Sequence, residues 1–232
     1  AKVVISSRKA GPCEEVAAGI NAKKAGHAIA VPANISSQED LQRLMDETRK
    51  AFGKIDILVS NAGVSLGTDL VTIDEETWDA NVDIVLKGTY LFARAVLPGM
   101  IARRRGGILN IASTAAWQGL MWLPVYSASK AFVVTWSEAV WVSLRGSGVR
   151  CCCVSPGPVD TPFFDANDLT ARPPAWLMQS AETVAERALR AYARDDCHVL
   201  PFLPFRLAAW STRLVPRALA ARFGARYAAP PR

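Results

Sequence analysis

The stretch GGILNIASTAAWQGLMWLPVYSASK, residues 106–130, contains the two elements that decide the fold. Its segment 108–112 is a short apolar run of the kind that forms a buried strand. From about residue 124 to 145 the apolar residues follow a helical period instead. A strand closely followed by a long helix is the repeating unit of parallel α/β sheets, so this stretch predicts one such unit.

The same alternation continues in both directions along the chain. Ser36 and Glu39 form a capping box for one of the helices. The run 55–59 is almost continuously apolar, as in strands buried on both faces. The pattern predicts an α/β fold: a single domain with a doubly wound, Rossmann-like parallel sheet. The further strand-like runs are 3–6, 28–31, 55–59 and 149–154, and the further helical patterns are 12–25, about 39–52 and 75–103.

Composition narrows the class of protein. The chain has 232 residues, of which 50% are hydrophobic and 21% charged, which excludes disorder for most of its length. It contains no run of about 18 uncharged apolar residues and no signal peptide, so we expect a cytoplasmic protein. The formal charge of +6 comes from six arginines after residue 196, where Lys, Asp and Glu are absent. We therefore expect a domain at 1–200, a basic amphipathic tail at 201–232, and no nucleic-acid binding.

The five cysteines do not indicate a metal site or a disulfide framework. Their number is odd, and their spacing matches neither a C-x-x-C motif nor a Cys/His zinc pattern. Residues 151–153 are three cysteines inside an apolar run, where small buried thiols are common. We expect reduced cysteines that serve packing.

Tyr126 and Lys130 are the first candidates for chemistry, because a separation of four residues places them on one face of the expected helix. A phenol has an ordinary pKa near 10 and needs a nearby cation to exchange protons at neutral pH. Ser113 ends the expected strand 108–112, at the edge of the sheet where ligands bind. Asn81 falls among apolar residues within the helix 75–103, which is an awkward place for an amide without a hydrogen-bond partner.

These residues, taken in order, resemble the short-chain dehydrogenase/reductase family. The family's catalytic Asn, Ser, Tyr and Lys correspond to Asn81, Ser113, Tyr126 and Lys130. Its N-N-A-G element appears as residues 60–63, with Ser60 in place of the first Asn, and its P-G element as residues 156–161. The resemblance covers residues 1–200 and implies an NAD(P)-dependent oxidoreductase.

The resemblance also implies a cofactor site. Arg8 follows the strand that meets the adenosine ribose, where an arginine pairs with a 2′-phosphate, so NADP(H) is expected in preference to NAD(H). Asn34 and Ile35 stand where the family usually has Asp-Val beside the adenine. The cofactor-binding residues implied are Ser7, Arg8, Asn34, Ile35, Asn61, Ala62, Gly63, Tyr126, Lys130, Pro156, Gly157, Val159 and Thr161.

The sequence departs from the family at its start. None of the 15 glycines forms the family's T-G-x-x-x-G-x-G turn, which holds the pyrophosphate. The family's first strand, which precedes this turn, is absent as well. About thirty residues, including a central strand and helix, are therefore expected to be missing. A chain without them is expected to bind the cofactor weakly and to expose a strand edge.

The resemblance implies interconversion of a carbonyl and a secondary alcohol, with Tyr126 as acid/base. Ser113 would hydrogen-bond the substrate oxygen, Lys130 would lower the tyrosine pKa and hold the nicotinamide ribose, and Asn81 would anchor a water. Aromatic residues and Met near these positions favour an apolar substrate: Trp117, Leu120, Met121, Trp122, Phe163, Phe164 and residues 173–178. Two alternatives stay open: a non-catalytic binding or regulatory protein, and an inactive fragment without the pyrophosphate site.

Two further surfaces suggest partners. Trp136, Val140, Trp141 and Leu144 recur at helical spacing, which favours either a homodimer or homotetramer interface or burial against the chain's own core. The segment 202–227 mixes aromatic residues and leucines with arginines, as in helices that bind anionic membranes. Prolines interrupt this segment, and packing of the tail on a neighbouring surface is the competing interpretation.

Overall fold

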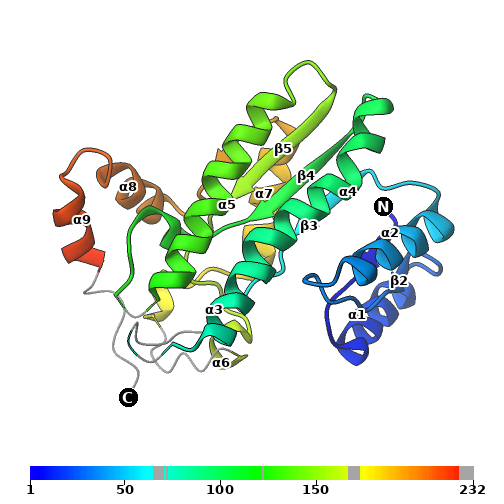
Figure 1. Ribbon diagram of the computed structural model, residues 1–232, viewed down its shortest axis with the longest axis horizontal. Coiled ribbons are helices and arrows are strands. Elements are labelled where there is room, and N and C mark those ends of the chain that lie inside the picture. Colours follow the sequence, from blue (N-terminus) through cyan, green and yellow to red (C-terminus); the bar gives the residue numbers. More distant parts are fainter. Residues whose placement is uncertain (65–70, 72, 122, 167–172, 225–232) are drawn as a thin grey trace.

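The computed structural model describes residues 1–64, 71, 73–121, 123–166 and 173–224, and it is an α/β fold with parallel strands (Figure 1). The predicted fold class is confirmed. The strands are β1 (Val3–Ile5), β2 (Ala28–Ala30), β3 (Ile57–Ser60), β4 (Gly106–Ile111), β5 (Val149–Val154) and β6 (His198–Val199). The α-helices are α1 (Ala10–Lys23), α2 (Gln38–Phe52), α3 (Glu75–Asn81), α4 (Gly88–Ala102), α5 (Pro124–Ser143), α6 (Phe163–Ala166), α7 (Ala181–Ala193), α8 (Leu203–Ser211) and α9 (Arg217–Gly224).

Strands β3 to β6 form one parallel sheet in sequence order, with helices on both faces. In β4 and β5, Ile108 and Cys151 point into a core cluster with residues of α2, α4 and α5. Their neighbours Leu109 and Cys152 point to the other face, where α7 covers them. In Figure 1, α4 and α5 accordingly lie on one side of β4 and β5, and α7 lies on the other. The alternation of apolar residues along these strands thus produces the doubly wound arrangement.

The parallel strands do not form one continuous sheet. β1 and β2 pair with each other, while β3 forms an edge of the four-stranded sheet, and within the described residues no strand joins β1 to β3. The prediction that 55–59 is a strand buried on both faces is wrong, because Ile57 is 48% exposed and Val59 53% exposed. Both faces of a strand are covered only when helices and neighbouring strands surround it, and among the described residues β3 pairs with a strand on one side alone.

The predicted helix 75–103 is continuous but not uniform. It runs from α3 through a π-helical segment, Val82–Lys87, into α4. Glu75–Ala102 has the length and apolar composition of a membrane-spanning helix. However, Val85, Phe92 and Met100 are buried in the core clusters of the domain, so we interpret this helix as a core helix.

The observed helix ends differ in part from the predicted signals. The N-cap of α2 is Ser37, whose side chain accepts a hydrogen bond from the Asp40 backbone N–H, so the predicted capping box of Ser36 and Glu39 is wrong by one residue. Pro204 lies in the first turn of α8, where proline is tolerated, and Pro216 separates α8 from α9. Pro216 therefore lies between the helices α8 and α9 of the tail, whereas Pro204 lies within α8.

The four side chains of the helix 124–145 that could form either an interface or part of the core are buried or partly buried against the core of the same chain. Leu144 belongs to the main core cluster, and Trp136, Val140 and Trp141 pack against it. All five cysteines are free, as expected, and burial raises the pKa of Cys152 to about 12. Four of the five are fully buried, so they serve packing.

Candidate active site

Ser113 lies at the carboxyl end of β4, where a short 3₁₀ turn, Thr114–Trp117, begins. Its hydroxyl oxygen accepts a hydrogen bond from the Ala115 backbone N–H at 3.1 Å. The next residue, Thr114, donates its backbone N–H to the Pro156 carbonyl at 2.9 Å. The loops that follow β4 and β5 are therefore joined beside Ser113.

Tyr126 lies in the first turns of α5, with Ser113 close enough to its hydroxyl to act on its pKa. Burial raises the pKa of Tyr126 because the phenolate loses hydration, and the Ser113 side chain acts against this rise. The tyrosine is therefore protonated at neutral pH, in the form that can donate a proton. The phenyl ring of Phe163 lies 6.3 Å from the Tyr126 ring, centroid to centroid.

Lys130 is buried one helical turn beyond Tyr126, and its Nζ donates to the Ile111 carbonyl at 3.0 Å. Its Nζ is 5.8 Å from the centroid of the Tyr126 ring. Burial lowers the pKa of Lys130 to about 8, because the ammonium loses hydration. The expected lowering of the tyrosine pKa by Lys130 is not found, since burial is the largest influence on both groups.

Asn81 is fully buried at the end of α3, where the helix changes to its π-helical segment. Its side-chain N–H donates to the Thr77 carbonyl at 2.8 Å. Its Oδ1 is buried and accepts no hydrogen bond from the described residues. A buried acceptor without a partner usually marks the position of a water or a ligand, and π-helical segments are frequent at functional sites.

The loop after β3 lies against the same lysine. Asn61, Ala62 and Gly63 are exposed residues that directly follow β3. A Cβ atom added to Gly63 would stand 3.1 Å from Lys130 Nζ. Glycine at this position therefore allows the loop to approach the ammonium group closely.

The loop after β5 carries Pro156, Gly157, Val159 and Thr161. Val159 forms an isolated parallel bridge with Gln179, and the Thr161 hydroxyl lies 3.4 Å from the Val159 carbonyl. A Cβ atom at Gly157 would come within 2.4 Å of the Phe205 ring. Helix α8 therefore packs directly on this loop.

The residues predicted for the adenosine half of the cofactor lie apart from this group. Ser7 and Arg8 are exposed just after β1, and Asn34 is exposed after β2. The side chain of Ile35 is buried in the core against Gly88. The structure thus joins Ser113, Tyr126, Lys130 and Gly63 in one group, with the adenosine residues on the other sheet.

Sequence reasoning missed a cluster next to Ser113. The ring of His198 stacks on Trp117 at 5.4 Å and shares a 2.8 Å hydrogen bond with the Ser155 hydroxyl. The guanidinium of Arg213 lies 4.8 Å from the centroid of the Trp117 ring. Burial and Arg213 lower the pKa of His198 to about 4, so the ring is neutral at pH 7. The mixture of arginine and aromatic residues in the tail was the only feature of the sequence that could have indicated this cluster.

Several residues predicted to shape the substrate pocket fall in different surroundings. Met121 and Trp176 are exposed, whereas Phe164 is buried and Phe163 contacts Tyr126. Trp122 lies outside the described residues. Phe163 is therefore the pocket candidate with the firmest link to Tyr126.

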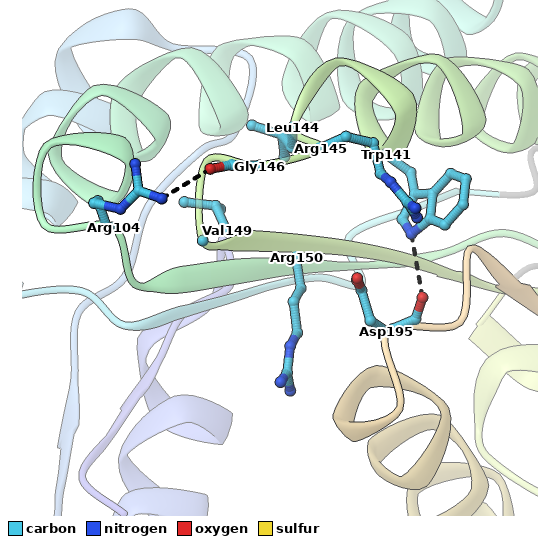
Figure 2. Close-up of a pocket in the computed structure, with 9 residues that line it drawn as sticks. Arg104, Trp141, Leu144, Arg145, Gly146, Val149, Arg150 and Asp195 are labelled. Atoms are coloured by element: carbon cyan, nitrogen blue, oxygen red, sulfur yellow. Dashed lines mark hydrogen bonds between the residues drawn. The ribbon is translucent and has the colours of Figure 1, made fainter.

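A cavity of about 540 Å³ lies at the opposite end of the sheet, near the start of β5 (Figure 2). Arg104 donates to the Gly146 carbonyl, Arg145 covers the Trp141 ring, and Arg150 projects from the other side of the strand. These arginines do not converge on one point. Ligands of parallel sheets bind beyond the carboxyl ends of the strands, so the chemistry belongs to the Ser113 end.

The Ser113 end fits the nicotinamide-ribose half of a dinucleotide. Lys130 has three N–H donors, of which one is used by the Ile111 carbonyl, so two are available to ribose hydroxyls. Tyr126 lies one helical turn from Lys130 on α5, and the loop of Gly63 comes close to the ammonium group. The donor set therefore suits a group with neighbouring hydroxyls.

Comparison with known proteins places these features in context. A family model described as short chain dehydrogenase matches residues 1–171. An uncharacterised oxidoreductase of Staphylococcus saprophyticus is 36% identical over 171 residues, covering 74% of this chain and 73% of that protein. Subunit BbsD of a (2S)-[(R)-hydroxy(phenyl)methyl]succinyl-CoA dehydrogenase of Thauera aromatica is 38% identical over 141 residues, covering 60% and 56%.

The fold of this chain is also similar to that of a solved structure. The crystal structure of a short-chain dehydrogenase/reductase of Burkholderia phymatum in complex with NAD has a TM-score of 0.82 with this chain. The two are 26% identical, and the match covers 92% of this chain and 83% of that one.

Proposed function

The chain belongs to the short-chain dehydrogenase family and is an NAD(P)-dependent dehydrogenase or reductase, and from this premise we propose that it interconverts a carbonyl and a secondary alcohol with Tyr126 as acid/base. The placement of Ser113 close to Tyr126, beside buried Lys130, carries the proposal. Two hydroxyls placed near each other can both face one substrate oxygen.

In the reducing direction, the Tyr126 hydroxyl donates its proton to the substrate oxygen while the Ser113 hydroxyl donates a hydrogen bond to it. The bound nicotinamide cofactor supplies or accepts the hydride. In the oxidising direction Tyr126 takes the proton from the alcohol, and Ser113 keeps the oxygen in place. Because the pKa of free Tyr126 is raised by burial, the proton-donating direction suits the protein as described.

Lys130 and Asn81 would assist this proton transfer through the cofactor and a water. Lys130 would hold the ribose hydroxyls through its two remaining donors. Asn81 Oδ1, which is buried and unpaired among the described residues, would hold a water that passes protons between Lys130 and solvent. The residues that follow β3 and β5 would line the nicotinamide end of the cofactor site. They are Asn61, Ala62, Gly63, Pro156, Gly157, Val159 and Thr161.

We assign NADP(H) as the preferred cofactor because Arg8 is exposed just after β1, with Ser7 beside it. A guanidinium can bind a phosphate through two N–H donors. NAD(H) is the alternative, since the similar protein from Burkholderia phymatum is described in complex with NAD.

Titration with NADPH and NADH, followed by reduction of a series of apolar ketones, tests both parts of the proposal. Arg8→Asp is expected to weaken NADPH binding by roughly 10- to 100-fold, which corresponds to the loss of a charge-assisted hydrogen bond of about 1.5–3 kcal/mol. NADH binding should change little, and an exposed arginine such as Arg94 offers the control Arg94→Asp. Equal loss for the two nucleotides would contradict the assignment to the 2′-phosphate.

The pKa of Lys130, about 8, sets a pH dependence for cofactor binding. Below pH 8 the side chain is an ammonium, and above pH 8 it loses its proton. The affinity for NADPH is therefore expected to fall by roughly ten-fold between pH 7 and pH 9.5, because the charge-assisted hydrogen bonds of the ammonium are lost. Fluorescence titration at several pH values measures this change in affinity. Lys130→Arg keeps its charge throughout and should remove the dependence, whereas a flat profile for the unmodified protein would contradict this role.

We propose an apolar substrate. Phe163 lies beside Tyr126, and Trp117 lies in the turn that follows Ser113. The similar Thauera protein is named for a phenyl-substituted substrate. We further propose a cytoplasmic homodimer or homotetramer, although the aromatic face of α5 is packed against the core of the same chain.

A further inference from the structure

Helix α8 presents a row of large apolar side chains to solvent. Leu203, Leu207 and Trp210 are spaced by four and three residues, which places them on one face of α8, and Leu214 lies in the turn that follows the helix. They are 52%, 55%, 55% and 86% exposed. We name these four residues the α8 stripe. In Figure 1, α8 and α9 lie at the outer margin of the molecule.

The opposite face of α8 is the one that packs on the domain. Phe205 and Ala209 point inward, with Phe205 against Gly157 in the loop after β5. Beyond the helix, Arg213 covers the Trp117 ring beside Ser113. An amphipathic helix on a protein normally buries its apolar stripe, so a stripe that faces away indicates a second apolar partner.

The charge around the stripe indicates what that partner is. Arg206 lies 5.8 Å from the Trp210 ring centroid, and Arg213 follows the end of α8. Helix α9 adds Arg217, Arg222 and the half-exposed Leu219. From residue 197 to 232 the sequence contains six arginines and no acidic residue. Apolar residues combined with cationic side chains fit the interface of an anionic bilayer.

A second copy of the chain fits this surface poorly. A two-fold interface through the α8 stripe would place the same arginines of both copies opposite one another. The rest of the chain has equal numbers of acidic and basic residues, so it has no net negative charge to balance these arginines. Anionic lipid supplies the opposite charge and the apolar layer together.

We propose that α8 and α9 lie on an anionic membrane surface, with the α8 stripe inserted among the lipid headgroups and acyl chains. The inner face of α8 rests on Gly157, and Arg213 rests on Trp117, so membrane binding brings the loops around Ser113 and Tyr126 to the bilayer. An apolar carbonyl dissolved in the membrane would then reach Tyr126 without crossing water. This last step rests on the proposed function, whereas membrane binding does not.

Co-sedimentation tests binding with vesicles of phosphatidylcholine alone and with one quarter phosphatidylserine, at 0.1 and 0.5 M salt. The full chain is expected to bind the anionic vesicles at least ten-fold more tightly, and high salt should weaken that binding. The double variant Leu207→Glu/Trp210→Glu should lose at least ten-fold of the affinity. Leu189→Glu changes a similarly exposed leucine on α7, 54% exposed, and should bind as the unmodified chain does.

Leu214 lies beyond the end of α8, so Leu214→Glu offers a second variant that leaves the packing of the helix untouched. Equal binding to neutral and anionic vesicles, or unchanged binding of both stripe variants, would overturn the proposal. So would a dimer in solution that the stripe variants dissociate, without vesicle binding. Ketone turnover without lipid is measured separately, so failure of the catalytic proposal is distinguishable from failure of this one.

Discussion

Replacement of Tyr126 by Phe is expected to lower kcat for carbonyl reduction by about 10²- to 10⁴-fold, the usual contribution of a general acid. The hydroxyl is removed, and with it the proton that the substrate oxygen must receive. Ser113 keeps its own hydrogen bond with the Ala115 backbone, so the loop around it should hold its position. Cofactor affinity should change by less than about three-fold, because Lys130 still donates to the Ile111 carbonyl.

Steady-state kinetics and a NADPH titration on the same preparation measure the two quantities. Tyr192→Phe is the matched control, since Tyr192 is a partly buried tyrosine on α7 that packs on the far face of the sheet. Its kcat is expected to stay within about two-fold. If Tyr126→Phe retained full turnover, another group would be the acid. If both the variant and the unmodified chain lacked turnover but bound the nucleotide, the non-catalytic alternative would gain support.

The largest effect on stability is expected for Gly148→Ala, at the end of the sheet away from Ser113. Gly148 has φ +79°, a conformation that costs other residues about 1–3 kcal/mol. An added Cβ would also stand 2.3 Å from the Arg104 carbonyl oxygen, so the backbone before β5 must shift. We expect the free energy of unfolding to fall by about 3–5 kcal/mol and Tm by about 6–15 °C.

Gly146→Ala separates the two causes of that loss. Gly146 has φ +78° but no atom within 4 Å of an added Cβ, so it carries only the conformational cost. Thermal unfolding should therefore show a smaller loss for Gly146→Ala, about 1 kcal/mol. Equal losses for the two variants would mean that the Arg104 backbone moves freely. Turnover per folded molecule should be unchanged in both, which is the reverse of the Tyr126 result.

The order of strands and helices could be predicted because each element carries its own periodicity. The strand before Ser113 and the helix with Tyr126 and Lys130 needed only local patterns, and their fixed spacing brought the three side chains together. The apolar run 55–59 does not by itself predict the exposure of Ile57 and Val59, because that depends on which strand lies beside β3; only the expectation of an exposed strand edge pointed to it. The apolar run alone does not identify that neighbour.

Long-range contacts of the tail escaped prediction for a related reason. Trp117 and Arg213 are separated by most of the second half of the chain, and no spacing rule joins them. The sequence also did not show which face of α8 would turn inward, since both faces carry aromatic residues. The raised pKa of Tyr126 depends on burial by Phe163 and its surroundings, which becomes visible only in three dimensions.

The attachment of β1 and β2 to the other strands depends on side-chain packing. Within the described residues, no ladder of backbone hydrogen bonds joins this smaller unit to β3, and its contacts to α4, β4 and β5 run through one shared core cluster. Such a unit can open at a lower free energy than global unfolding. Because it carries Arg8 and Asn34, a nucleotide that binds there would hold the unit closed, and part of its binding free energy would appear as protection of the whole fold.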